Sequence, residues 1–541
     1  MKTKYILLGI FILLNFTRAE SQVKPLKDIR IGPTNSNPYA LVVCNNKLFF
    51  TADDGIHGIE LWVSDGTTKG TFMLKDIYPG SISMSLGPFV AFNNNLFFVA
   101  NDKVLGRELW KSDGTPEGTQ MVMDLSQGNF NGIPDQSSLV ATRDELTFVG
   151  SNGSPYYQLW SSDGTEPGTK QITNFTDQTG YIIKLIAKLK DTYLFTRKMN
   201  FIQTELWLSD GTEHGTFSIS DTADKHLLSY SDKHVQLDSI LIFSARDSAH
   251  GDEIWRSDGT LNGTYILKDI AQDDLNSTPN LLTLHQNKVF FVTTDLNWNY
   301  TLWETDGSKL GTKEVFKFNA NTYVRAIYSL LGKLYFVIDD PAVFGREIWY
   351  LEGGKLSLLK DICKGNNSSE PESLIQIDSL IYFAARDETG WNSIWTSNGT
   401  REGTQIYHKM NDVQGLGSKL LTNYKNHLYF TGFNFSTGQE VFTDDPHISS
   451  ISNVNSSLGI EIYPNPVVDV LHIDFSKLNP SGFASEIKIQ VFNVHGQIMI
   501  DSELPMDLNE IEIDIRSLSK GIYTIVFQTE NSIFSQKLLK E

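Results

Sequence analysis

The sequence contains very little cysteine: only Cys44 and Cys363 occur in 541 residues. The two lie far apart along the chain, so a disulfide would require distant segments to meet with suitable geometry. Two unreactive, partly buried thiols are the simpler interpretation. We therefore expect the fold to be stabilised by packing rather than by covalent links.

Basic residues are also scarce relative to acidic ones. The net charge is −19, and no cluster of lysines and arginines stands out. This charge balance argues against nucleic acid and anionic membrane surfaces as partners. The acidity itself is interpreted as a contribution to solubility.

The motifs of common catalytic and cofactor sites are missing as well. His57, His214 and His250 are isolated and lack the spacing of zinc ligands, and no Gly-Lys-Ser/Thr phosphate loop occurs. Nothing in the sequence marks a nucleophile. We therefore predict no catalytic residue, no metal site and no cofactor.

Long apolar runs are absent except at the N-terminus. Tyr5–Phe16 is an apolar run of about a dozen residues behind two lysines, which is too short to span a bilayer comfortably. Residues 1–19 are predicted to be a secretory signal peptide cleaved after Ala19, with Ser21/Gln22 as a nearby alternative. We expect an exported mature chain without a transmembrane segment.

What the sequence has in abundance is a repeat. Glu60–Thr67 reads Glu-Leu-Trp-Val-Ser-Asp-Gly-Thr, is followed by Lys69-Gly70-Thr71, and returns at Glu108–Thr115. Phe442 takes the place of the tryptophan in a ninth copy. A regular period of this kind indicates a repeat architecture. The tryptophans recur every 46 to 50 residues, at Trp62, Trp110, Trp160, Trp207, Trp255, Trp303, Trp349 and Trp395.

Each repeat contains four strand-like pieces separated by turn signals such as Asp65-Gly66. In the third strand Leu61 and Trp62 point to opposite faces, because strand residues alternate. Both side chains are large and apolar, so both faces need cover. Four strands in each unit of this length are typical of a β-propeller blade. In the first repeat the expected strands are Tyr39–Val43, Leu48–Ala52, Ile59–Ser64 and Thr71–Asp76.

The two ends of the array complement each other. Val23–Ile29 resembles the fourth strands of other repeats, whereas the last copy, Leu421–Phe442, stops after three strands. Pairing the two would close a ring and remove two exposed edges. We therefore predict an all-β fold whose residues 23–445 form a large propeller of about nine four-stranded blades closed by an N-terminal strand. Eight blades with one degenerate copy outside the ring is the alternative.

The pattern Glu-Leu-Trp-x-Ser-Asp-Gly-Thr-x-x-Gly-Thr resembles the ELWxxDGT repeat family, which occurs in tandem in secreted bacterial proteins. The resemblance covers roughly residues 23–445. It implies a propeller-like array and does not imply an established activity.

The repeat ends before the C-terminus. Residues 446–458 are small and polar and are predicted to be a linker. Residues 459–541 form a second all-β unit, for which alternation such as that in Leu471–Phe475 predicts a small Ig-like β-sandwich. Its strands are expected at 470–475, 487–493, 497–501, 510–515, 522–528 and 532–538.

This C-terminal unit resembles the type A sorting domain of the type IX secretion system. The resemblance implies that the type IX machinery carries the folded chain across the outer membrane. It also implies removal of the domain, followed by release or attachment to surface lipopolysaccharide. The matching residues include Tyr463, Pro464, Asn465, Pro466, Gly496, Gly521, Tyr523, Lys537 and Lys540.

The repeated polar residues are candidates for chemistry, but their recurrence in most repeats favours structural roles. The Asp-Gly step could bind calcium or sugar; alternatively, Asp closes a turn in which Gly takes a positive φ. Asn398 in the eighth repeat and Glu352-Gly353 in the seventh replace Asp-Gly, which favours the turn. The recurring Glu before Leu-Trp is expected to bond nearby backbone or arginines, because a glycosidase needs two particular acids. The repeat tryptophans are expected to pack between blades.

Four aromatic residues fall outside the periodic positions, in loops before third strands, where function specific to one blade can reside. They are Trp298, Trp391, Tyr156 and Tyr157, with local packing as the alternative. The leading hypothesis is a propeller that binds a glycan or a protein without catalysis. The alternatives are a polysaccharide hydrolase or lyase with a site at the propeller mouth, and a surface-layer protein that associates with itself.

Overall fold

The computed structural model describes residues 23–83, 86–134, 139–142, 144–154, 156–176, 182–198, 204–219, 228–272, 274–409, 420–445, 461–463, 467–474, 486–493, 498–505, 510–528 and 533–540. The chain divides into two compact units, with the boundary between Ile448 and Ser449. All regular secondary structure in these ranges is β-strand, so the all-β prediction is confirmed. The predicted signal peptide with Ala19, and the predicted linker 446–458, lie outside the described residues and stay predictions.

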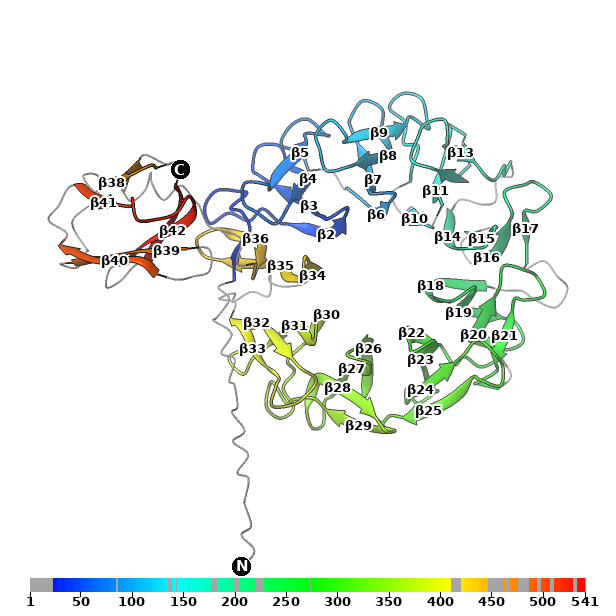
Figure 1. Cartoon of the computed structure of the whole chain (residues 1–541). Helices are drawn as coiled ribbons and strands as arrows, with labels where there is room; N and C mark the ends of the chain where they lie inside the picture. The colour runs from blue at the N-terminus through cyan, green and yellow to red at the C-terminus, as the bar shows by residue number, and fades with distance from the viewer. Residues whose placement is uncertain are drawn as a thin grey trace, which may run out of the picture. The chain divides into compact units, whose positions relative to one another are not determined.

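The first unit consists of nine four-stranded blades, numbered 1 to 9 in chain order, each running from an inner first strand to an outer fourth strand (Figure 1). Blade 1 contains β2 (Tyr39–Cys44), β3 (Lys47–Asp53), β4 (Ile59–Ser64) and β5 (Phe72–Lys75), and blade 2 contains β6 (Phe89–Phe92), β7 (Asn95–Asn101), β8 (Arg107–Ser112) and β9 (Gln120–Met123). Blade 3 contains β10 (Leu139–Ala141), β11 (Leu146–Gly150), β12 (Gln158–Ser162) and β13 (Lys170–Gln171), and blade 4 contains β14 (Ile182–Leu189), β15 (Thr192–Lys198), β16 (Thr204–Ser209) and β17 (Phe217–Ser218).

The remaining blades repeat this order. Blade 5 joins blade 4 in one sheet through a single pair, Glu205 with Leu228. Blade 5 contains β18 (Leu228–Leu237), β19 (Ile240–Asp247), β20 (Gly251–Ser257) and β21 (Tyr265–Lys268), and blade 6 contains β22 (Asn280–His285), β23 (Lys288–Thr294), β24 (Tyr300–Thr305) and β25 (Lys313–Lys317). Blade 7 contains β26 (Tyr323–Leu330), β27 (Lys333–Asp340), β28 (Gly345–Glu352) and β29 (Lys355–Leu358), and blade 8 contains β30 (Glu372–Ile377), β31 (Leu380–Arg386), β32 (Asn392–Ser397) and β33 (Gln405–Lys409).

Blade 9 is completed by the start of the chain. Its own strands are β34 (Leu421–Tyr424), β35 (His427–Asn434) and β36 (Gly438–Thr443), and its fourth strand is β1 (Lys24–Pro25). Lys24 and Pro25 pair with Thr443 and Phe442, and the Leu26 amide donates to the Val441 carbonyl at 2.7 Å. The closed nine-blade ring is confirmed and the eight-blade alternative is wrong, because the ninth copy is a blade of the ring.

Packing between blades follows the alternation of the third strand. Leu61 is fully buried in a cluster that includes Phe98 and Trp110 of blade 2. Trp62, only 6% exposed, lies in a cluster with Tyr424 of blade 9. The predicted role of the repeat tryptophans in packing between blades is therefore confirmed at this position.

The second unit contains two antiparallel sheets. Side chains from both sheets, among them Leu471 and Ile473 from one and Ile489 and Val491 from the other, form one buried cluster, as in the expected sandwich. Strand β37 was not expected from the sequence. The sheets are β37 (Glu461–Tyr463), β38 (Val470–Asp474) and β41 (Glu510–Asp514), and β40 (Ile498–Pro505), β39 (Glu486–Phe492), β42 (Gly521–Gln528) and β43 (Ile533–Lys540).

Ring closure depends on Leu26, whose side chain is fully buried against blades 1 and 9. We expect Leu26→Ala to lower the free energy of unfolding of the propeller by about 2–5 kcal/mol, because it leaves a cavity at the closing seam. Ile31→Ala is the matched control, since Ile31 is 89% exposed nearby in sequence. Denaturant unfolding of both variants measures the difference; equal stabilities would contradict the closing role.

Candidate functional site

The Ser-Asp-Gly-Thr segment forms a hydrogen-bonded turn between the third and fourth strands. In blade 1 the Asp65 Oδ1 accepts bonds from the Thr67 amide and from its hydroxyl, both at 2.8 Å. The Gly66 amide donates to Ser64 Oγ at 3.0 Å, and the Ser64 and Thr71 hydroxyls are 2.7 Å apart. The aspartate is thus engaged by its own turn.

Two glycines make this turn possible. Gly66 has a φ of +96°, a backbone conformation that residues with a side chain rarely adopt. A Cβ atom on Gly70 would lie 2.1 Å from Asp65 Oδ1. In blade 8 Asn398 Oδ1 accepts the corresponding bonds from Thr400 at 3.1 and 2.8 Å, so a neutral amide closes the same turn. The structural interpretation of this motif is confirmed.

Blade 7 lacks this turn. Here β28 and β29 are joined only by Gly353 and Gly354, and Glu352 pairs with Lys355 across a two-residue hairpin. Both glycines have positive φ, as a type I′ turn requires. Equating Glu352-Gly353 with the Asp-Gly step was therefore wrong, because the loop is shortened and not substituted.

The glutamate before Leu-Trp binds backbone amides, as predicted. In blade 2 Glu108 is fully buried and accepts bonds from the Leu125 amide at 3.1 Å and the Gly132 amide at 2.8 Å. A serine hydroxyl donates to the corresponding glutamate at 2.7 Å in three other blades, in the pairs Ser277–Glu253, Ser369–Glu347 and Ser36–Glu440.

Burial dominates the electrostatics of these carboxyls. It raises the pKa of Glu60, Glu253 and Glu440 to about 7, and a nearby aspartate adds to the increase while the amide donors oppose it. The pKa of Glu108 and Glu347 rises to about 8 for the same reasons. All five side chains are buried and accept hydrogen bonds from backbone amides of the segment that follows the fourth strand. They therefore act as structural clasps that hold this segment against the blade.

The four candidate loop aromatics lie in three different blades and do not form one site. Trp298, between β23 and β24 of blade 6, is 69% exposed and has a φ of +62°. Its loop is held by Asp295, which accepts bonds from the Asn297 and Asn299 amides at 2.8 and 2.9 Å. Trp391 of blade 8 is half-buried between β31 and β32.

Tyr156 and Tyr157 are half-buried in the loop between β11 and β12 of blade 3, and Tyr157 lines a groove of about 460 Å³. The groove is also lined by Phe130, which is 67% exposed in the loop after blade 2. Polar atoms come mainly from serines and asparagines. The lining residues are Ser126, Gln127, Phe130, Asn131, Ser151, Asn152, Gly153, Ser154 and Tyr157, none of which is acidic.

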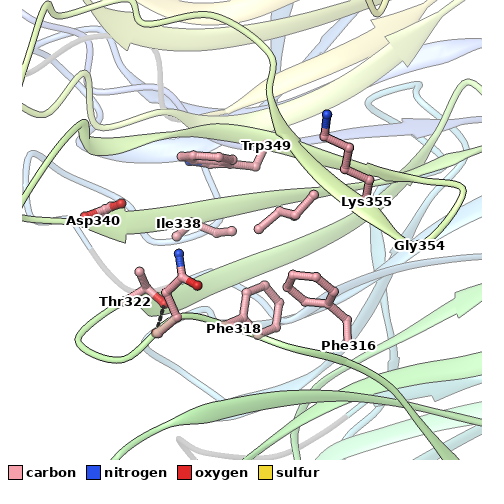
Figure 2. A pocket seen from close by; sticks show the side chains of 10 residues that line it. Phe316, Phe318, Thr322, Ile338, Asp340, Trp349, Gly354 and Lys355 are labelled. Atoms are coloured by element: carbon pink, nitrogen blue, oxygen red, sulfur yellow. Dashed lines mark hydrogen bonds between the residues drawn. The ribbon is translucent and has the colours of Figure 1, made fainter.

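A second pocket, which the sequence did not reveal, opens between blades 6 and 7 (Figure 2). It has a volume of about 280 Å³ and is walled by Phe316, Phe318 and Trp349, with Asp340 and Lys355 at its margins. The one available signal was a pair of departures from the repeat, the shortened turn of blade 7 and Phe316 in the preceding fourth strand.

Within the described ranges, no group of three or more His, Cys, Asp or Glu side chains could hold a metal ion. Both cysteines are free thiols, Cys44 buried and Cys363 half-buried. Across the same ranges, no helix is long and apolar enough to cross a bilayer.

Several residues of the predicted sorting motif have defined positions. The Tyr523 hydroxyl donates to the Ser519 carbonyl at 2.9 Å, and Lys540, nearly fully buried, donates from Nζ to the Val468 carbonyl. Tyr463 ends β37, Gly521 begins β42 and Lys537 lies in β43. Pro464, Asn465, Pro466 and Gly496 lie outside the described residues.

Residues 461–541 match the family model of the secretion system C-terminal sorting domain. This tail marks the chain as cargo of the type IX secretion system. This match indicates export, followed by secretion or attachment at the cell surface, and it confirms the corresponding prediction. No curated protein matches the chain.

Solved structures show only distant similarity. One of two prolyl endopeptidases has a TM-score of 0.41 and 11% identity, over 75% of this chain and 55% of that chain. Puromycin hydrolase has a TM-score of 0.32 and 11% identity, over 67% and 60%. TolB from Acinetobacter baumannii has a TM-score of 0.28 and 12% identity, over 48% and 62%. The chain thus spans less than two thirds of the length of each.

The buried glutamates make stability depend on pH. Their pKa rises from 4.5 to about 7 or 8 on folding, so the folded state binds protons more tightly than the unfolded chain between these values. We expect the Tm of the propeller to fall, by on the order of a few degrees, as the pH rises from about 5.5 to about 8.5. Thermal unfolding across this range measures it, and Glu108→Gln should reduce the slope. A Tm that stays constant or rises with pH would contradict this account.

The sorting assignment predicts that export fails without residues 459–541. The propeller has its own clusters of buried side chains and should fold without the second unit. We expect the truncated chain to accumulate in the periplasm as a folded, protease-resistant protein. Cell fractionation and immunodetection, with the full-length chain as the control, measure this. Normal secretion of the truncated chain would refute the assignment.

Proposed function

We propose that this exported propeller binds a glycan, without catalysis, in the groove between blades 2 and 3. The observation that carries the proposal is the pairing of two aromatic side chains, Phe130 and Tyr157, with a wall of serines and asparagines. Sugar rings have apolar C–H faces that pack on aromatic rings, and their hydroxyls bond to amides and hydroxyls. The groove offers both kinds of contact.

The polar wall is held in place by the fold. Asn131 Oδ1 accepts a bond from the Arg107 amide at 3.0 Å, and Asn152 Oδ1 accepts one from the Ser154 amide at 3.3 Å. These bonds hold the two side-chain amides in place, so their positions need less ordering when a ligand binds. Such preorganisation lowers the entropic cost of binding.

The absence of acidic residues from the groove lining supports binding rather than hydrolysis. Most glycosidases act through two carboxyl groups that flank the bond to be broken. The buried repeat glutamates are clasps within the blades and do not line this groove. The proposed function is therefore recognition of a surface or extracellular glycan.

Trp298 and Trp391 are proposed as further contacts for an extended ligand. They occupy the same type of loop as Tyr157, between the second and third strands of blades 6 and 8. Because such loops lie on the same side of a propeller, one long polymer could touch several of them. The exposed ring of Trp298 is the stronger candidate of the two.

A glycan array with the purified propeller tests the proposal. We expect binding to at least one glycan, and Tyr157→Ala should weaken it by about tenfold or more, because it removes one aromatic platform. Phe435→Ala is the matched control, since Phe435 is 64% exposed in the corresponding loop of blade 9. No binding by the folded wild type, or an equal effect of both variants, would refute the groove as the site.

A further inference from the structure

In four interfaces between blades, a lysine covers the repeat tryptophan of the next blade. The ammonium nitrogens lie 5.5 to 5.9 Å from the indole centroids in the pairs Lys27–Trp62, Lys75–Trp110, Lys268–Trp303 and Lys360–Trp395. Each ammonium also donates to the carbonyl of a threonine that closes the covered blade's turn, namely Thr71, Thr119, Thr312 or Thr404. The repeat therefore supplies its own cation to an aromatic face.

The interface between blades 6 and 7 has lost both parts of this arrangement. Phe316 pairs with Leu302 in blade 6 as Lys268 pairs with Ile254 in blade 5, so a phenylalanine stands at the lysine position. The threonine carbonyl that would accept the ammonium is also missing, because blade 7 has the two-residue hairpin at Gly353 and Gly354. This interface therefore lacks both the lysine that would cover the tryptophan and the carbonyl that would accept a bond from its ammonium.

Trp349 is consequently left half-buried beside the pocket of about 280 Å³. Phe316 and Phe318 meet edge to face, with centroids 5.2 Å apart, and line the opposite wall (Figure 2). In the described part of the chain no cation lies over the Trp349 ring. At Trp207, which is also half-buried, the Arg197 guanidinium already lies 5.4 Å from the ring centroid.

One side of the pocket is negatively charged. Asp340, at the end of β27, accepts one long bond from the Ala342 amide at 3.3 Å, and no ion pair to it is formed by any described residue. Figure 2 shows the Trp349 indole between Asp340 and Lys355, which lie at opposite ends of the group of side chains. A cation on the indole would therefore lie on the side of the group that carries the carboxylate when it is turned away from Lys355.

We propose that this pocket binds a lysine side chain of a protein partner. The ammonium lies over Trp349 and pairs with Asp340, while the aliphatic stem packs against the wall formed by Phe316 and Phe318. The partner thus provides in trans the group that the repeat provides in cis at the four interfaces named above. A carboxylate beside aromatic rings recognises a cation rather than a neutral sugar or an aliphatic side chain.

A short peptide with one lysine, capped at both ends, is the probe, and the same peptide with Nε-acetyllysine is its neutral counterpart. Ligand-observed NMR with the full-length protein measures binding of both. We expect the lysine peptide to bind and the acetylated peptide to bind at least about fivefold more weakly, because acetylation removes the charge. Equal binding of the two, or no binding of the lysine peptide, would overturn the proposal.

Two variants locate the site without removing Trp349 from the core. Asp340→Asn should weaken binding of the lysine peptide about fivefold, because it removes the carboxylate. Phe316→Lys should abolish binding, because it restores the lysine of the repeat and fills the pocket from within. Thermal unfolding confirms that both variants are folded, and full binding by folded Phe316→Lys would refute the site.

Asp339→Asn is the matched control for charge. Asp339 is adjacent to Asp340 and is already paired with Arg325 at 3.0 Å and Arg346 at 3.2 Å. Its substitution should leave peptide binding unchanged. Tyr157→Ala should also leave it unchanged, so this proposal and the glycan-binding proposal can fail independently.

Discussion

Each blade of this propeller carries large apolar side chains on both faces, and this constraint governs the rest of the structure. Leu61 faces blade 2 and Trp62 faces blade 9, so blade 1 cannot bury its core alone. Every blade therefore needs two neighbours, and an open row would leave two apolar faces and two strand edges exposed. Closure by β1 satisfies this requirement by joining the start of the chain to blade 9. Beside this strand the Ile29 amide donates to Glu440, a residue 411 positions further along the chain.

The same constraint explains why the repeated polar residues serve the fold. Asp65 closes a turn, Glu108 clasps the segment after the fourth strand, and Lys27 spans two blades. A residue engaged in this way in blade after blade has few bonding positions left for a ligand. Departures from the repeat, in contrast, leave groups without their usual partner, as at Trp349, or place aromatics in loops, as at Tyr157 and Trp298.

The two proposed sites differ in how visible they were in the sequence. Tyr157 was identifiable because it is an aromatic residue outside the period, but its partner Phe130 comes from the preceding connection and was not anticipated. The pocket at Trp349 was missed, because the substitution of lysine by Phe316 and the loss of two turn residues lie in different repeats. The two changes form a pocket only because they face each other across the interface between blades 6 and 7.

The sequence by itself predicted most of the strands, a ring of about nine blades, the closing strand and the sorting tail, because period, alternation and motif are local properties of the chain. It also indicated structural roles for Asp65 and the glutamates, since recurrence argues against a unique site. Tertiary structure alone decided which faces meet, which lysine covers which tryptophan, and where a cover is absent. The reason is physical: contacts between blades join residues far apart in the chain, such as Lys75 and Thr119, which are 44 positions apart, and no local pattern specifies the space between them.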